Sequence, residues 1–459
     1  MKFTSYNLRL AIGAVLALAA EIVFASAQQT NSDTLPIDLP TALRLAGAQN
    51  LDVQIARDRL KEAQADRASA LEKFFPWLAP GVSYHRRDGV AQAVPAGTIS
   101  DAHFQSYSPG ATVAAQMDLG DAIYTTLASK QVANAASHAF DAQRQDAVLA
   151  AAQGYFDLAK AQALVGAADE ALQIARDYQN QLHEAVAAGI AFKGDELRAQ
   201  TETEHDQILL RRAVERQRVA AAQLAQMLHL DATVELVPKA SDLVPLTLVE
   251  TNATLDALAR QALQNRPELQ RNRALTLAAR DVKNGATYGP LIPTIEAQYF
   301  GGRLGGGPDA GPGNFGPESD LFAGVTWRIG PGGLFDFGKI HSSRARLDAR
   351  RAAEEKIHDQ ILREVVEART RADSLHDQLA TAQTDLTTAD ETLRLTQQRK
   401  DFGVGVVLEN IQAQQALAQA RADYLDILAE YDKAEYDLSR AIGGTLEAGG
   451  GRTNSPPFK

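Results

Sequence analysis

The chain contains no cysteine among its 459 residues. Disulfides, thiolate metal sites, cysteine nucleophiles and an N-terminal lipid-anchor cysteine are therefore excluded. Lysine and arginine form no basic block and the formal net charge is −11, so nucleic acid is not an expected partner. Beyond the N-terminal segment the sequence has no run of about eighteen apolar residues, so we expect any passage through a membrane to use strands.

Residues 1–27 have the pattern of a secretory signal peptide. A positively charged start precedes the apolar stretch from Leu10 to Ala20, and Ala25-Ser26-Ala27 offers a cleavage site. A transmembrane anchor is the alternative, but the stretch is too short to span hydrocarbon and Glu21 follows it. We expect export with Gln28 as the first mature residue. Because the signal carries two positive charges and one negative charge, the net charge of −11 becomes −12.

The rest of the chain carries two copies of one plan. The segment that begins at Ala42 resembles the segment at Ala257, at an offset of 215 positions, and Gly189 and Gly403 are 214 positions apart. A nearly constant offset indicates duplication. We predict a first repeat over 28–240, a linker over 241–254, a second repeat over 255–443 and a disordered tail over 444–459.

Each repeat is predicted to hold a helix of about thirty residues, two strands and a long helical hairpin, the hairpins turning at residues 189 and 403. In the second hairpin apolar positions recur in steps of four and three, which is typical of a coiled-coil seam. They are Ile361, Val365, Ala368, Ala372, Leu375, Leu379, Ala382, Leu386, Ala389, Leu393 and Thr396. Similar stripes follow at 413–441 and, in the first half, at Val165, Ala168, Leu172, Ala175, Gln179, Leu182 and Val186. Alanine-rich stripes bury little area, so one hairpin needs partners.

Four segments alternate apolar and polar residues, at about 77–88, 107–118, 292–301 and 321–329. The pattern fits a lipid-facing barrel with a wet lumen, and it also fits half-buried strands of a soluble protein. Four strands are too few to close a barrel, whereas three chains supply about twelve and leave no free edge. Aromatic residues at or along these strands suit membrane-interface belts; they are Trp77, Tyr84, Tyr107, Tyr299 and Trp327. The segments 89–106 and 302–320 are rich in glycine and proline, so we interpret them as surface loops.

These features together resemble the TolC family of outer-membrane channels. The most specific local matches are Trp327 followed by Leu334-Phe335-Asp336-Phe337-Gly338, and the turns at Gly189 and Gly403. The resemblance implies a mainly α fold, a homotrimer with a twelve-stranded transmembrane β-barrel in the outer membrane, and a coiled-coil α-barrel in the periplasm. It implies a passive export duct for small molecules or proteins in a tripartite efflux pump or type I secretion system, with a periplasmic adaptor protein and an inner-membrane pump as partners.

The resemblance also implies site residues. Gly189-Ile190 and Gly403-Val404 correspond to adaptor-binding turns, and the two glycines also suit helix C-caps. Glu409 and Gln412 correspond to an inward ring that narrows the periplasmic entrance, and Asp195 corresponds to an acid beside the first turn. Three Glu409 carboxylates on a threefold axis would repel one another and raise their pKa. Alternatively, Glu409 is only an acid in the first turn of a helix.

The partner of Asp195 is left open by the sequence. The position of the arginine that binds this acid in the family falls on Gly405, and Lys193 and Lys400 are candidate replacements. Residues 333–340 nearly spell a phosphate-binding loop but lack the final hydroxyl, and no serine elbow or zinc-binding helix is found.

We therefore expect no enzyme activity, cofactor or metal site. Carboxylates interspersed with arginine and lysine are interpreted as a solvated coiled-coil face. The alternative function is a periplasmic coiled-coil adaptor or scaffold without a pore. The sequence does not indicate the transported substrate or the pump.

Overall fold

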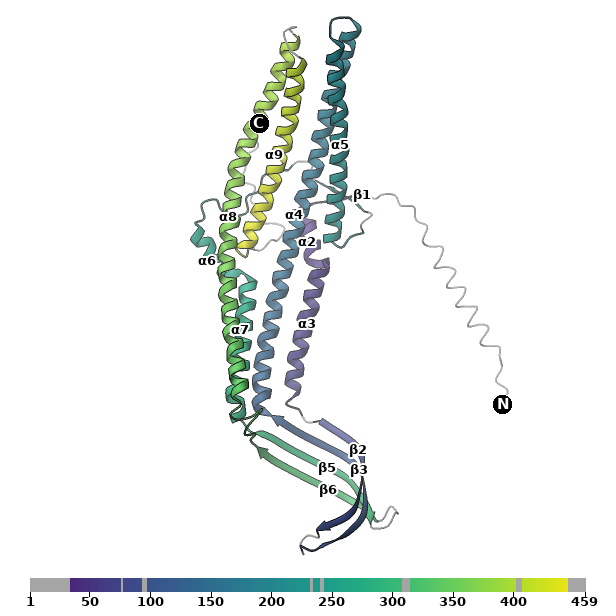
Figure 1. Ribbon diagram of the computed structural model, residues 1–459, viewed down its shortest axis with the longest axis vertical. Helices are drawn as coiled ribbons and strands as arrows, with labels where there is room; N and C mark the ends of the chain where they lie inside the picture. The colour runs from purple at the N-terminus through teal and green to yellow at the C-terminus, as the bar shows by residue number, and fades with distance from the viewer. Residues whose placement is uncertain are drawn as a thin grey trace, which may run out of the picture. The chain divides into compact units, whose positions relative to one another are not determined.

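A computed structural model describes residues 34–75, 77–92, 97–231, 234–239, 243–307, 314–401 and 407–444 (Figure 1). The predicted signal peptide, the second hairpin turn and nearly all of the predicted tail lie outside the described residues. The helices are α2 (Leu39–Gln49), α3 (Leu51–Glu72), α4 (Leu119–Ala187), α5 (Lys193–Met227), α6 (Leu255–Asn265), α7 (Pro267–Tyr288), the 3-10 helix η1 (Gly289–Leu291), α8 (Phe337–Asp401) and α9 (Val407–Ala441). The strands are β1 (Thr34–Ile37), β2 (Trp77–Gln92), β3 (Ile99–Asp118), β4 (Glu235–Pro238), β5 (Thr294–Gly307) and β6 (Asn314–Thr326).

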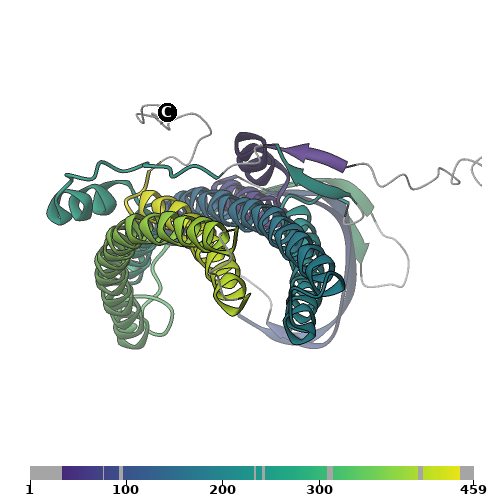
Figure 2. The same cartoon turned by 90° about the horizontal axis from the view of Figure 1, so that it is seen from above.

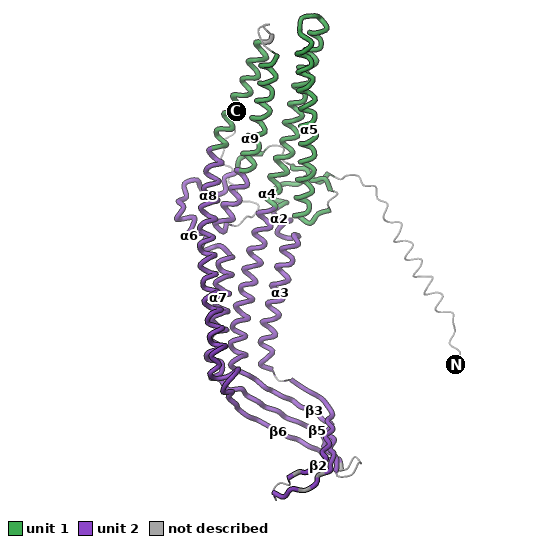
Figure 3. The backbone as a smooth tube through the Cα atoms, viewed as in Figure 1, with its two compact units in different colours: residues 1–42, 151–245, 378–430 green, residues 43–150, 246–377, 431–459 purple. Residues whose placement is uncertain are grey.

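The chain divides into two compact units, coloured separately in Figure 3. Unit 1 comprises 1–42, 151–245 and 378–430, and unit 2 comprises 43–150, 246–377 and 431–459. Helices α2, α4, α8 and α9 contribute residues to both units. Each unit therefore takes segments from both halves of the chain, and the compact units do not follow the predicted repeat boundaries.

The single helix predicted at the start of each repeat is wrong, because two helices occupy each place. Asn50 separates α2 from α3, and its side chain accepts the backbone N–H groups of Asp52 at 2.9 Å and Val53 at 3.3 Å. This is an N-cap, which begins a new helix. In the second half Arg266 is extended and Pro267 occupies the first turn of α7, a position that proline favours.

The predicted seam of α8 is buried along its length. Seven of its members are at most 8 % exposed: Ile361, Val365, Ala372, Leu379, Ala382, Ala389 and Leu393. In unit 2 this seam packs on Ala434 and Leu438 of α9, and in unit 1 it packs on Ala413 and Leu417. Figure 2 shows α8 and α9 running side by side. The predicted combination of long antiparallel helices with strands is confirmed.

One position of the predicted α4 stripe is wrong. Leu172, Ala175 and Leu182 are buried as expected, but Tyr178 is 5 % exposed and Gln179 is not part of the core. Because Tyr178 and Gln179 are adjacent, they point about 100° apart on a helix. The buried face of α4 therefore includes Tyr178, where the spacing of three and four residues predicted Gln179.

The four-stranded sheet of unit 2 is antiparallel, in the order β2-β3-β5-β6. Its strands are longer than predicted, because pairing continues through Val90↔Asp101 and Gly305↔Phe315. The interpretation of 89–106 and 302–320 as loops is therefore largely wrong. Strand pairing is formed by backbone N–H and C=O groups, so a segment rich in glycine can still pair. A parallel pair, β1 with β4, was not predicted, since each strand has only four residues.

A close backbone contact marks the junction between helices and sheet in unit 2. Gly120 lies in the first turn of α4 and Gly289 lies in η1. A Cβ atom on Gly120 would lie 2.1 Å from the carbonyl oxygen of Gly289. No side chain fits there without moving the backbone. Beside this contact the first pair of the β3–β5 ladder is Asp118↔Thr294.

Candidate functional site at the helical hairpin ends

The end of the α4–α5 hairpin is a glycine-capped turn with an exposed apolar tip. Gly189 has φ +73°, its N–H donates to the Val186 carbonyl at 3.0 Å, and the Ile190 N–H donates to the Ala185 carbonyl at 2.9 Å. These two bonds form a Schellman motif. The side chains of Ile190 and Phe192 are 82 % and 73 % exposed. Sequence reasoning selected Ile190 and missed Phe192.

Two carboxylates follow this turn, and the structure gives them different partners. Asp195 accepts a hydrogen bond from Arg198 of its own helix at 3.2 Å. Glu196 binds Lys193 at 2.7 Å and His183 of α4 at 2.9 Å. The hydrogen bond from Lys193, followed by that from His183, lowers the pKa of Glu196 below its ordinary value. Lys193, a candidate partner of Asp195, therefore binds the neighbouring acid instead.

The second hairpin is described up to its turn. Gly403-Val404 lie outside the described residues, as does the side chain of Lys400. Glu409, in the first turn of α9, accepts a hydrogen bond from Arg399 of α8 at 3.1 Å, and the two side chains are 42 % and 54 % exposed. Gln412 is exposed one turn later. Sequence reasoning named Glu409 and missed the arginine beside it.

The two hairpins of unit 1 touch through a small buried cluster. It consists of Tyr178 and Leu182 of α4, Ala199 of α5 and Ile411 of α9. Beside it Asn410 is 3 % exposed; its Oδ1 accepts from Gln414 at 2.8 Å, while its Nδ2 has no hydrogen-bond partner in the described structure. Burial, with a contribution from the Asp195 charge, raises the pKa of Tyr178 to about 12. An unsatisfied buried amide weakens this contact between hairpins.

The sheet has one apolar and one more polar face. The register places Leu78, Val113, Tyr299 and Leu321 in one row across all four strands. These side chains are 64 %, 42 %, 49 % and 74 % exposed. On the opposite face Gln116 donates to Glu296 at 3.1 Å. Phe300 and Phe322 also lie on that face, so the separation of apolar from polar side chains is incomplete.

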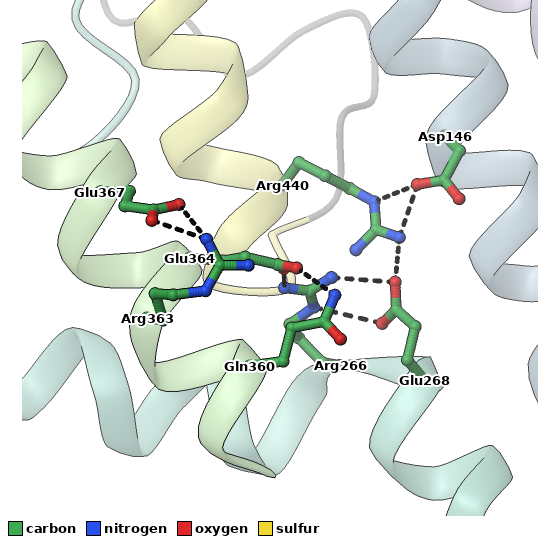
Figure 4. A network of polar contacts seen from close by, with 8 residues as sticks. All are labelled: Asp146, Arg266, Glu268, Gln360, Arg363, Glu364, Glu367 and Arg440. Carbon is green, nitrogen blue, oxygen red and sulfur yellow. Dashed lines mark hydrogen bonds and ion pairs between the residues drawn. The ribbon is translucent and has the colours of Figure 1, made fainter. Parts of the chain in front are cut away.

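A buried ion-pair network in unit 2 was missed from the sequence (Figure 4). Arg266 binds Glu268 at 3.0 Å and also binds Glu364, and Arg440 binds Asp146 at 2.7 Å and also binds Glu268. The side chains of Arg266 and Arg440 are 9 % and 6 % exposed. The interpretation of such charges as a solvated face is wrong here. Burial raises the pKa of Glu268, but the hydrogen bond from Arg266 and the charge of Arg440 outweigh it and lower the pKa to about 2.

The described residues contain no group of three or more histidine, aspartate or glutamate side chains that could hold a metal ion. Among the described helices, none has a stretch both long and apolar enough to cross a membrane.

Paired long hairpins from both halves of the chain and a four-stranded sheet with an exposed apolar face define a class of helical export channel subunit. The model of the outer membrane efflux protein family matches residues 42–229 and 258–444, so the chain belongs to that family. It is an outer-membrane efflux channel protein, in a family of passive channels and not of enzymes. No curated protein sequence matches this chain.

Solved structures share the fold. The chain is similar to a membrane protein from Pseudomonas aeruginosa, with 20% identity, a TM-score of 0.75, and coverage of 91% of this chain and 96% of that one. It is similar to the CmeC outer membrane channel of Campylobacter jejuni, with 17% identity, a TM-score of 0.73, and coverage of 92% and 91%. The VceC outer membrane protein of Vibrio cholerae gives 18% identity, a TM-score of 0.72, and coverage of 89% and 97%.

Proposed function

We propose that three copies of the chain assemble into one channel. Their sheets close into a twelve-stranded barrel in the outer membrane, and their helical hairpins form a periplasmic duct that receives substrate from an inner-membrane pump through an adaptor protein. Substrates pass through without chemical change. The observation that carries this proposal is the exposed apolar row of Leu78, Val113, Tyr299 and Leu321, which crosses every strand of the sheet.

The free edges of the sheet support assembly. Among the described strands β2 and β6 each pair on one side only. A strand edge cannot remain unpaired in hydrocarbon, because its N–H and C=O groups find no water there. Four strands are also too few to close on themselves. Pairing β6 of one copy with β2 of the next satisfies both edges and directs the apolar row toward lipid.

Reconstitution in a planar bilayer tests this proposal. The purified chain is expected to be a trimer and to give stable conductance. Leu321→Lys, on the apolar face, costs roughly 2–4 kcal/mol near the bilayer midplane and lowers insertion. Gln298→Lys, on the opposite face, leaves insertion intact and changes the ion preference of the conductance. A soluble monomer without conductance would instead support the scaffold function.

We also propose that the first hairpin end contacts the adaptor protein through Gly189-Ile190, joined by Phe192. Their large exposed apolar surface supports this role. Ile190→Asp is expected to lower export in cells while the conductance of the purified channel stays unchanged. Ile208→Asp is the matched control, because Ile208 is also exposed, at 50 %, but lies within α5 away from the turn. Equal loss of export in both variants would contradict the role of the turn in binding the adaptor protein.

We propose further that Glu409, with Gln412 after it and Asp195 near the other turn, sets the charge of the periplasmic entrance. Arg399 changes the expected chemistry, because it supplies one positive charge beside each Glu409 carboxylate. A ring built from such pairs repels itself less than a ring of carboxylates alone. The entrance therefore has a weaker preference for cations than Glu409 alone would give.

A further inference from the structure

Helices α4, α5 and α9 enclose a groove of about 670 Å³ within unit 1. Half of its lining residues are alanine or leucine, including Leu164 of α4, Leu209 and Ala213 of α5, and Ala418 of α9, and the other half are polar or charged. Grooves of this size and lining suit the apolar body of a small organic molecule. All lining residues belong to one chain and one unit, so the groove does not depend on assembly of a trimer.

One charged side chain in this groove is buried without a counter-ion. Asp206 of α5 lines the groove and is 8 % exposed, and no described residue donates a hydrogen bond or supplies an ion pair to its carboxylate. Arg212 and Arg216 also line the groove, but both are exposed to solvent, whereas two other charged groups of the lining have partners. Lys160 binds Asp426 at 2.9 Å, and Glu202 accepts a hydrogen bond from Gln415 at 2.7 Å.

The charges around Asp206 come from all three helices. Those on α5 are Glu202, His205, Arg212 and Arg216, those on α4 are Asp157 and Lys160, and those on α9 are Asp426 and Arg421, the last bound to Glu170 at 2.9 Å. Burial, with a contribution from Glu202, raises the pKa of Asp206 to about 6, and His205 opposes the rise. The carboxyl is therefore mostly ionised at neutral pH. A buried negative charge without a partner is unfavourable, and a bound cation would relieve it.

We propose that this groove binds a small organic monocation with an apolar body, its charged nitrogen against the Asp206 carboxylate and its body on the alanine and leucine lining. Glu202, one helical turn from Asp206, adds to the preference for positive charge. The same two carboxylates disfavour an organic anion. A neutral molecule of the same shape gains only the apolar contact. The site goes beyond the passive duct proposed above and would exist in a single chain.

Titration calorimetry on the purified full chain in neutral detergent tests the site, with detergent alone as the blank. The probes are 4-phenylbutylammonium, 4-phenylbutanol and 4-phenylbutyrate, which share an apolar body and differ in charge. At pH 7.5 the ammonium is expected to bind about tenfold more tightly than the alcohol, as one desolvated charge pair allows. The carboxylate probe is expected not to bind. Equal affinity of the ammonium and the alcohol overturns the proposal without any variant.

Three substitutions test whether the Asp206 carboxylate and the groove bind the ammonium probe. Asp206→Asn keeps the side-chain shape and is expected to lower ammonium affinity about tenfold. Asp157→Asn, which removes a more exposed carboxylate from the same groove, is expected to change it less than about twofold. Ala418→Phe fills the groove and is expected to abolish binding. Unchanged affinity in Asp206→Asn, or in Ala418→Phe, contradicts the site.

The pH dependence gives an independent readout. Between pH 7.5 and pH 5 the Asp206 carboxyl takes up a proton, because its pKa is about 6. Ammonium affinity of the unmodified chain is therefore expected to fall about fivefold over this range, because the ionised fraction falls about tenfold while the protonated form still binds about a tenth as tightly. In Asp206→Asn the affinity is expected to stay flat. A parallel decline in both proteins would assign the effect to another group.

Discussion

Two regions of the molecule use the same residue types to different effect. In unit 2 Arg266 and Arg440 are nearly buried and share Glu268 between them. At the hairpin ends of unit 1, Asp195 pairs with Arg198 and Glu409 pairs with Arg399, and all four side chains are at least a quarter exposed. Water and ions screen the second group of charges but not the first.

The difference separates a fixed region from one that can open. Breaking a buried pair leaves an uncompensated charge and costs about 3–5 kcal/mol, whereas an exposed pair contributes about 0–1 kcal/mol. The buried network joins residues of α4, α7, α8 and α9 in unit 2. The hairpin ends have small apolar clusters and an unsatisfied amide at Asn410. Local opening is therefore expected at the hairpin ends first.

The largest effect is expected from Arg266→Met. It leaves Glu268 and Glu364 without one of their partners and is expected to lower stability by about 3–5 kcal/mol, seen as a lower melting temperature of the purified protein. Because the pKa of Glu268 is lowered to about 2 from its ordinary value of 4.5, its contribution is present above pH 4.5 and is lost as the pH falls toward 2. Arg198→Met is the control and is expected to leave the melting temperature unchanged. A similar fall in melting temperature in both variants would contradict the difference between the buried network and the exposed pairs.

A second test concerns a buried carboxyl in unit 2 that has no arginine. Asp432 is fully buried, accepts a hydrogen bond from the Leu246 N–H at 2.8 Å, and its Oδ2 has no partner in the described structure. Burial, with a contribution from Glu435, raises its pKa to about 8. The folded state therefore favours the protonated form, and stability is lost as the pH rises from about 4 to about 8, by at most roughly 1.4 kcal/mol per pH unit.

Asp432→Asn removes this ionisation and keeps the acceptor oxygen. The melting temperature of the variant is expected to exceed that of the unmodified chain at pH 8 and to approach it at pH 5. Asp157→Asn is the control, because the Asp157 side chain is 44 % exposed. A variant that is equally sensitive to pH would show that Asp432 is not the responsible group.

The pair of Arg399 and Glu409, at the proposed periplasmic entrance, is expected to give a smaller effect, read by single-channel recording. Glu409→Ala is expected to weaken divalent-cation block, because it removes the carboxylate and leaves Arg399 alone. Arg399→Ala is expected to strengthen block and cation preference, because it leaves Glu409 uncompensated. The two variants should therefore shift the channel in opposite directions. Unchanged block in Glu409→Ala would exclude Glu409 from the entrance.

The smallest effects concern glycines. Gly189→Ala places a Cβ atom on a residue with φ +73°, which costs about 1–2 kcal/mol and should accelerate hydrogen exchange at the end of α4. Gly166→Ala lies inside α4, where a Cβ atom meets nothing within 4 Å, and should stabilise the helix by about 0.5–1 kcal/mol. Equal effects would show that the turn conformation carries no strain.

Periodicity predicted the long helices and the sheet faces because their signals are local. The seam of α8 repeats every three or four residues, and Val113 and Tyr299 lie in segments where apolar residues recur at every second position, so each can be read from a short window. The turn at Gly189 was also visible, since a helix end with positive φ favours glycine.

The buried charges could not be read in this way. Asp146, Arg266, Glu364 and Arg440 lie far apart in sequence and look like ordinary surface charges. The two arginines are buried only because helices from both halves of the chain meet around them, while the side chains of Glu364 and Asp146 remain 29 % and 55 % exposed. The strand ends were missed for a related reason: the ladder between Gly305 and Phe315 depends on backbone partners, not on composition. The groove around Asp206 likewise requires three helices.

The contact between Gly120 and Gly289 sets a rule for chimeras. Gly120 lies in the first turn of α4, in the first half of the chain, and Gly289 precedes β5 in the second half, so a chimera must take both glycines from the same parent. A hybrid that takes its four-stranded sheet from one relative and its helices from another must cut on the strand side of both positions. A cut that takes Gly120 from one parent and Gly289 from the other would bring together two backbone segments that do not come from the same protein. Their close approach would then no longer be ensured.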